Sequence, residues 1–222
     1  MCSSDLTIVH SGDWKLDPDP RVGKLTDEAR LKQLGDEGVL ALMGDSTNAN
    51  SEGHSGSEGA LLESVRTLIG QSQGRVAVSL FASNAARIET VCAAAAANDR
   101  VVVMVGRSLW RTVAAARECG YLRDLPPLLE DDEGERLPSD HALYLVTGCQ
   151  GEQRAALARI AFGEHRTVKF ARNDTVIFSS KVIPGNEKPI ARAVNRLLRN
   201  GVKVVTEKDH FVHVSEIGRA HV

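Results

Sequence analysis

The feature that most constrains the fold of this chain is an alternation of short, Val-rich apolar runs with segments of helical periodicity. Several runs, of which VVVMV at residues 101–105 is the clearest, are apolar at every position. Strands of a parallel sheet read this way because helices cover both of their faces. We therefore expect strands over residues 7–10, 39–43, 75–80, 101–105, 142–147, 175–179 and 202–205.

The segments between these runs include three with the spacing of amphipathic helices, over residues 84–98, 109–118 and 188–200. The first has a single apolar stripe made of Ile88, Val91, Cys92 and Ala95. The resulting β-α-β rhythm predicts an α/β fold with a mostly parallel sheet flanked by helices. One stretch, residues 124–140, is rich in proline and acidic residues, and we expect it to be an exposed connection.

Composition narrows the class of protein without naming a function. The 222 residues carry a net charge of −2, so bulk charge does not point to a nucleic-acid partner, and any basic surface must be local. The four cysteines contain no C-x-x-C pair, which argues against a zinc knuckle or a disulfide framework. Reduced thiols in a cytoplasmic protein are the simplest interpretation. No apolar stretch is long enough to span a bilayer, so no membrane partner is expected.

The loops that follow the expected strands share one chemistry. Most contain Ser, Thr, Gly or Asn and then lead into a helix, as in SGD after residue 10, GDSTN after residue 43 and FASN after residue 80. Free N–H groups at helix starts and small hydroxyl groups suit phosphate oxygens, which predicts a phosphate-rich ligand. The alternative is that these residues only cap helices and form turns. None of the loops matches a P-loop or a G-x-G-x-x-G motif.

The ordered set of these loops resembles the ribonuclease J family, in the β-CASP branch of the metallo-β-lactamase superfamily. The resemblance is carried, in order, by VHSGDWKLDPDP, GVLALMGDSTNAN, FASNAARI, VVVMVGRSLW, TGCQGEQRAALARIAFGEHR, DTVIFSSKVIPGNEK and VHVS. It implies an incomplete metallo-β-lactamase domain with an inserted β-CASP domain. The implied boundaries are residues 1–55 for the partial hydrolase domain, 56–207 for the β-CASP domain and 208–222 for the return to the hydrolase domain.

The same resemblance assigns metal chemistry to Asp13. This residue matches the aspartate at a strand end that bridges two metal ions in the family, and a carboxylate can reach two hard cations. Zinc is the expected metal, with manganese or magnesium as alternatives. The family's H-x-H-x-D-H motif does not occur in the 222 residues. The chain is therefore expected to be an internal part of such an enzyme and to be inactive by itself.

The resemblance also implies roles for other strand-end residues. Asp45, in GDSTN, matches the acidic residue that opens the β-CASP signature and belongs to the catalytic region. Two segments match positions that hold the RNA substrate: Phe81, Ala82 and Ser83, and then His213, Val214 and Ser215. Phe81 could stack on a base, which would tolerate any sequence; a packed core aromatic is the equally plausible alternative.

Three functional hypotheses remain open from the sequence. The first is a metal-dependent ribonuclease, both a 5′→3′ exonuclease and an endonuclease, that acts in RNA processing and decay as a cytoplasmic homo-oligomer, either a dimer or a tetramer. The second is a non-catalytic RNA-binding or assembly subunit of a ribonuclease complex. The third is an unrelated sugar-phosphate or nucleotide-binding α/β domain, which explains the hydroxyl-rich loops but not the ordered set of family segments.

Overall fold

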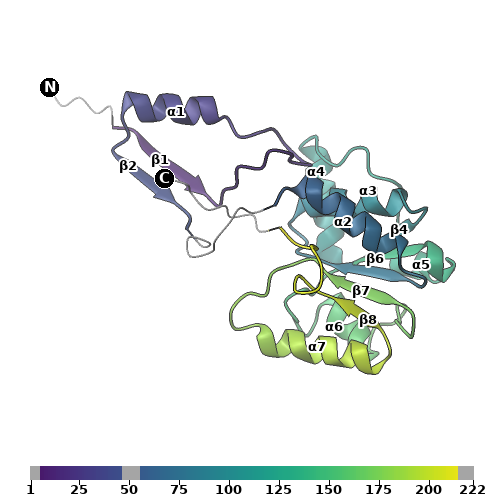
Figure 1. The fold of residues 1–222 in the computed structure, drawn as a ribbon. Coiled ribbons are helices and arrows are strands. Elements are labelled where there is room, and N and C mark those ends of the chain that lie inside the picture. Colours follow the sequence, from purple (N-terminus) through teal and green to yellow (C-terminus); the bar gives the residue numbers. More distant parts are fainter. Residues whose placement is uncertain (1–5, 47–55, 215–222) are drawn as a thin grey trace.

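The computed structural model describes residues 6–46 and 56–214, which form two parallel sheets of very different size (Figure 1). The smaller sheet pairs β1 (Ile8–Gly12) with β2 (Ala41–Gly44), and α1 (Glu28–Glu37) connects the two strands. The larger sheet has the strand order β5-β4-β6-β3-β7-β8, and all neighbouring strands are parallel. We call residues 6–46 the small unit and residues 58–205, from the start of α2 to the end of β8, the large unit.

The strands of the large unit are short and, in the middle of the sheet, completely buried. Their bounds are β3 (Val76–Ser79), β4 (Val101–Val105), β5 (Leu128–Leu129), β6 (Ala142–Val146), β7 (Thr175–Phe178) and β8 (Lys203–Val205). Every residue of β3, β6 and β7 is buried, as the unbroken apolar runs predict.

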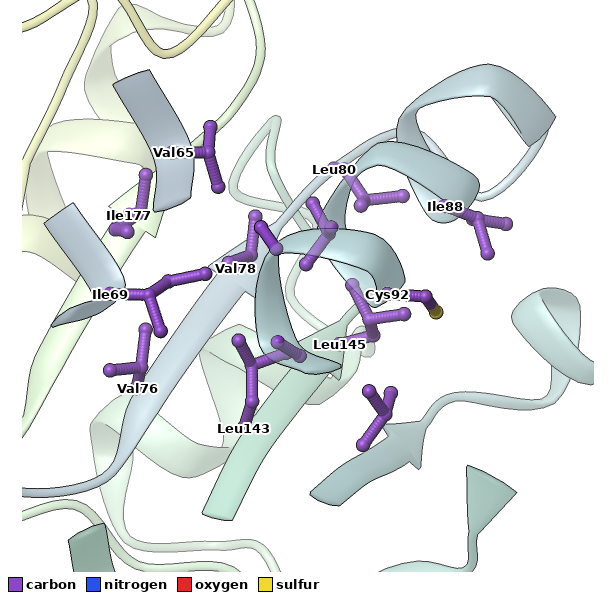
Figure 2. Packing of buried hydrophobic residues seen from close by; sticks show 14 of the residues in the cluster. Val65, Ile69, Val76, Val78, Leu80, Ile88, Cys92, Leu143, Leu145 and Ile177 are labelled. Atoms are coloured by element: carbon purple, nitrogen blue, oxygen red, sulfur yellow. The ribbon is translucent and has the colours of Figure 1, made fainter. Parts of the chain in front are cut away.

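Helices cover both faces of the large sheet. One face carries α2 (Glu58–Gly70), α3 (Ala85–Ala96) and α4 (Arg107–Glu118). Figure 2 shows apolar side chains of α2 and α3 packed on Val76, Val78 and Leu143. The other face packs α6 (Ala156–Phe162) and α7 (Glu187–Arg199) on the alternate strand residues, such as Ala77 and Tyr144. Successive strand side chains point to opposite faces, so each buried strand contributes to both cores.

The expected strands and helices are all present, with ends that differ by at most two residues. The α/β class with a mostly parallel sheet is therefore confirmed. The interpretation of residues 124–140 as an exposed connection was wrong: this stretch contains the edge strand β5 and the short helix α5 (Asp131–Gly134). Gly134 packs so closely against Val103 and Tyr144 that a Cβ there would lie 2.8 Å from Val103 Cγ1. Tertiary packing therefore orders a segment whose local composition resembles a loop.

Among residues 6–46 and 56–214, no helix has the length and apolar character needed to cross a bilayer.

Candidate functional site

The strands β3 and β7 form a topological switch point of the large sheet, and we call the place between the connections at their carboxyl ends the crevice. These strands are neighbours, and the helix that follows β3 packs on one face of the sheet while the helix that follows β7 packs on the opposite face. The two connections diverge from the carboxyl ends of their strands. Ligands of open α/β sheets bind at such switch points. The crevice between β3 and β7 is therefore a candidate site by topology alone.

A buried ion pair forms the floor of this crevice. The guanidinium of Arg87, in the first turn of α3, is 1% exposed and binds the carboxylate of Glu58 in a bidentate manner, with Nε–Oε1 and Nη2–Oε2 distances of 2.6 and 3.0 Å. Glu58 begins α2 and also accepts a hydrogen bond from Thr90 Oγ1 at 3.1 Å. This geometry fixes the starts of two helices against each other, since a planar guanidinium matches a carboxylate in only a few orientations.

The same guanidinium connects the end of β7 to the C-terminal segment. Arg87 Nη1 donates to Ser179 Oγ at 2.6 Å and lies 3.3 Å from Nδ1 of His213. Ser179 Oγ in turn donates to the carbonyl oxygen of Val212 at 2.6 Å. The chain after β8 is thereby held against the carboxyl end of β7, which brings residues about 130 positions apart in sequence into one network.

His213 is an uncharged member of this network at neutral pH. Burial is the main reason that its pKa falls from 6.5 to about 4, and the positive charges of Arg87, Lys181 and Lys15 lower it further. A neutral imidazole offers hydrogen bonds but no charge. Positive charge at the rim of the crevice therefore comes from lysines rather than from His213.

The loop after β3 forms the opposite wall of the crevice. Residues 81–83 make a tight turn in which the N–H of Asn84 donates to the carbonyl of Phe81 at 3.0 Å. Phe81 and Ala82 are partly buried, while Ser83 is exposed. Immediately before this loop, Ser79 Oγ is fully buried and has no hydrogen-bond partner among the residues that the structure describes. The end of β3 therefore carries small polar groups, of which the hydroxyl of Ser79 is closed to bulk water.

Segment 15–17 ties the small unit to this site. The carboxylate of Asp17 accepts the backbone N–H of Glu58 at 3.0 Å and pairs with Lys15 Nζ at 2.9 Å. Burial by itself would raise the pKa of Asp17, but the bonds from Lys15 and from the N–H groups of Asp19 and Glu58 outweigh it and lower the pKa. Asp17 therefore stays ionised and holds Lys15 near the crevice.

The two acidic residues assigned to the catalytic region lie at the ends of the small sheet. Asp13 follows β1 and is exposed, and Asp45 follows β2 and is partly buried. The parallel pairing of Gly12 with Gly44 places these two strand ends side by side, and Trp14 Nε1 donates to the carbonyl oxygen of Asp45 at 3.1 Å.

A metal ion does not fit the side chains of the described residues by themselves. Within residues 6–46 and 56–214, no three His, Cys, Asp or Glu side chains are grouped closely enough to hold one. A zinc site needs three or four protein ligands, of which Asp13 would be one. We therefore derive no chemical step through a metal from this structure.

The predicted site residues consequently fall into two groups. Asp13 and Asp45 share one edge of the small sheet, and Phe81, Ala82, Ser83, His213 and Val214 share the carboxyl edge of the large sheet. Ser215 lies outside the described residues.

Sequence reasoning missed Arg87, Glu58 and Ser179. One signal for Arg87 was available, because it lies four residues before Val91 and therefore on the apolar stripe of its helix.

Comparison with known proteins decides the family. A family profile described as "Ribonuclease J, beta-CASP domain" matches residues 73–197, which is more than half of the chain. The chain belongs to the ribonuclease J family. The matched residues run from just before β3 into α7, so they contain both strands of the switch point and most of the large unit, while Glu58 and His213 lie outside the match. This part of the chain is the β-CASP domain of that family.

Relatives in this family align with nearly the whole chain. A ribonuclease J of Sinorhizobium meliloti is 47% identical over 209 residues, which cover 94% of this chain and 37% of the relative. Those of Thermus thermophilus and Mycolicibacterium smegmatis are 42% and 41% identical, again over 94% of this chain and over 36% and 38% of the relatives. The chain therefore spans little more than a third of the length of these ribonuclease J relatives.

Proposed function

We propose that this chain is part of a ribonuclease that acts on the phosphodiester bonds of RNA, and that the crevice between β3 and β7 holds the RNA. The observation that carries the proposal is the position of the matched β-CASP region, whose sheet ends in a polar, partly closed crevice at a topological switch point. Proteins named ribonuclease J also align with 94% of the chain.

Each predicted substrate residue has a chemical role in this proposal. Phe81 stacks on a base, an interaction open to any of the four bases. Ser83 and the neutral imidazole of His213 donate to or accept from the sugar-phosphate backbone, and Lys181 supplies positive charge at the rim. Ala82 presents backbone groups to the RNA. Val214 is buried and accepts a hydrogen bond from Arg87 Nη2 at 3.4 Å, so it orients the second substrate segment, which Ser215 continues in sequence.

The catalytic part of the proposal concerns the small unit. We propose that Asp13 is a metal ligand and Asp45 a catalytic-region acid in the intact enzyme, with zinc as the metal and manganese or magnesium as alternatives. Asp13 would help to hold such an ion, which would supply a Lewis acid for hydrolysis of the phosphodiester bond. Asp13 is suited to this role because it is an exposed carboxylate at the end of a strand. Both 5′→3′ exonuclease and endonuclease activities in RNA processing and decay belong to this proposal.

The organisation of the intact enzyme is also part of the proposal. Residues 56–207 form the β-CASP domain, and residues 1–55 and 208–222 belong to a metallo-β-lactamase domain that surrounds it in sequence. We place the enzyme in the cytoplasm as a dimer or tetramer. The free thiols of Cys92, Cys119 and Cys149 are consistent with a reducing compartment.

An RNA-binding assay tests the crevice. The chain is titrated into a fluorescein-labelled, 5′-monophosphorylated 10-nucleotide RNA and followed by anisotropy. Phe81→Ala should weaken binding about 5- to 150-fold, since loss of one aromatic–base stack is worth about 1–3 kcal/mol. Phe162→Ala is the matched control, because Phe162 is an exposed aromatic at the last residue of α6, away from the strand ends. Equal affinities for the two variants would contradict an RNA site at this crevice.

A cleavage assay tests the catalytic assignment. The 222-residue chain should not cleave RNA in the presence of Zn²⁺ or Mn²⁺, because the described residues hold no complete metal site. Cleavage by the chain that is lost in Asp13→Ala would overturn this expectation.

The second candidate is a non-catalytic RNA-binding or assembly subunit, which would use the crevice between β3 and β7 without metal ligands. It predicts RNA binding without cleavage by the native protein that contains this chain, whereas the ribonuclease predicts cleavage that a chelator abolishes.

A further inference from the structure

A second switch point lies between β4 and β6, at the same edge of the large sheet. The chain leaves β4 through α4 on one face and leaves β6 through α6 on the other face (Figure 1). A cleft of about 740 Å³ opens where the two connections diverge. Its walls include the start of α4, the loop after β6, the start of α6 and the start of α5. None of the predicted substrate residues contributes to this cleft.

Positive charge dominates the cleft. Four arginines line it, two from α4 and two from α6 and the loop before α6: Arg107, Arg111, Arg154 and Arg159. All four are exposed, and none forms an ion pair with another described residue. The acidic residues of the cleft are Glu130 and Asp131, and Asp131 Oδ2 is occupied by a hydrogen bond from Thr167 Oγ1 at 2.6 Å. The guanidinium groups therefore exceed the carboxylates by two and have unused donors.

The end of the cleft supplies further donors. The 12-residue helix α4 begins there after Gly106, and no side chain caps its N-terminus. The indole Nε1 of Trp110, one turn later, is buried and has no hydrogen-bond partner in the part of the chain that the structure describes. Gly106 is necessary at this point, because a Cβ on it would lie 2.6 Å from Cγ2 of Thr147 at a backbone φ of +134°. The start of α4, the four arginines and Trp110 thus all line the same cleft, and a helix start favours an anionic ligand there.

We propose that this arginine-lined cleft binds the phosphate backbone of the same RNA strand that occupies the crevice between β3 and β7. The inference rests on the proposed function, which supplies the RNA. In the strand order β4-β6-β3-β7, the two switch points are separated by two strand spacings, about 10 Å along one edge. A single-stranded RNA that follows this edge reaches both sites with successive nucleotides. The crevice then stacks a base and the cleft neutralises phosphates.

Arginine suits this task better than lysine would. Its planar fork binds two phosphate oxygens at once, and its face can stack on a base. The open cleft and its exposed side chains favour a continuous strand over a small enclosed ligand, because a free nucleotide would leave much of its surface in water.

The experiment compares two double variants that remove equal charge. Arg107→Ala with Arg154→Ala removes two of the four cleft arginines, whereas Arg172→Ala with Arg199→Ala removes two exposed arginines near the opposite, amino edge of the sheet. Binding of a labelled 20-nucleotide oligouridylate is measured by anisotropy between 50 and 300 mM KCl. The cleft variant should bind roughly tenfold more weakly at 100 mM salt and lose about 1.4 units of the log–log salt slope, about 0.7 for each lost phosphate contact. The amino-edge variant should match the wild type.

The length of the RNA and competition by a free nucleotide then identify the ligand of the cleft. Shortening the labelled oligouridylate from 20 nucleotides to one should remove most of the difference between the wild type and the cleft variant, since a single nucleotide cannot reach both sites. Wild-type binding of RNA with an unchanged cleft variant overturns the cleft and leaves the proposed function standing. Absence of RNA binding by the wild type overturns both. Displacement of the long RNA by uridine monophosphate at equal nucleotide concentration, in the wild type but not the cleft variant, identifies a nucleotide site and overturns the RNA path.

Discussion

The small and large units contain similar apolar strands, but these strands differ greatly in burial. Every residue of β3 and β6 is buried, whereas every residue of β2 is exposed, including Leu42 at 70% and Met43 at 58%. In the large unit helices cover both faces of the sheet, while in the small unit no described helix or strand covers β2. A two-stranded sheet is at best marginally stable by itself. An apolar strand therefore stabilises a fold only when a second layer removes it from water.

Limited proteolysis with trypsin is the most direct test of whether the small unit is less stable than the large unit. Lys24, Arg30 and Lys32 in the small unit should be cut at least about 100-fold faster than Arg159 or Arg192 in the large unit. The reason is that local opening requires far less free energy than global unfolding. Intact-mass spectrometry should show a protected core close to residues 56–207. Equal rates of cleavage in both units would show that they unfold together.

Loss of Arg87 should have the largest effect on stability. Arg87→Ala leaves the carboxylate of Glu58 buried without its cation, and we expect the free energy of unfolding to fall by about 3–5 kcal/mol in urea titrations. Arg21→Ala is the control, because the pair between Arg21 and Glu89 is partly exposed and should contribute less than about 1 kcal/mol. Similar losses in both variants would mean that burial of the first pair is unimportant.

A matched pair of leucines sharpens the comparison of the two sheets. Leu145 in β6 is 0% exposed, and Leu145→Ala should cost about 2–5 kcal/mol of unfolding free energy through lost burial and a cavity. Leu42→Ala, in β2, should change it by less than about 0.5 kcal/mol. A large loss in Leu42→Ala would reveal that β2 is covered in solution.

The pH dependence of stability should report on His213. Its pKa is about 4 in the folded chain and about 6.5 when unfolded, so between these values the unfolded chain binds the extra proton. The free energy of unfolding should therefore be at its maximum above pH 6.5 and should fall by up to about 3 kcal/mol as the pH drops toward 4. His213→Gln should flatten this decline in urea titrations at pH 7, 5.5 and 4.5. His165, whose pKa burial also lowers, leaves a second contribution in that variant.

The smallest expected effect on the free energy of unfolding is that of Asp17→Asn, whose pH dependence falls below the pH range of His213. The pKa of Asp17 is lowered in the folded chain, so its contribution is present above its unfolded pKa and is lost as the pH falls through the folded value. Asp17→Asn should reduce stability at pH 7 by about 1 kcal/mol and make the loss below pH 4 shallower. A variant as stable as the wild type at pH 7 would show that the link between Asp17 and α2 is not stabilising.

Some elements could not be predicted because their local signals are weak or misleading. Residues 124–140 carry prolines and acids, yet Leu128 and Leu129 pair with β4 and order the stretch. The helices α2 and α6 were not predicted either, although α2 buries Leu61, Val65 and Ile69. Arg87 is a charged residue in a core position, and composition favours the surface for such residues. In each case long-range partners outweighed local preference.

The sequence by itself determined the parallel α/β sheet, the family and the strand-end loops that hold the candidate site, because unbroken apolar runs, β-α-β spacing and ordered motifs are local properties of the chain. Only the tertiary structure decided which loops share a site. Arg87, Ser179 and His213 meet because β3 and β7 are neighbours in the sheet, and arginines at positions 107 and 154 meet because β4 adjoins β6. Strand order is set by crossover connections and by burial over the whole domain, and no local segment encodes it.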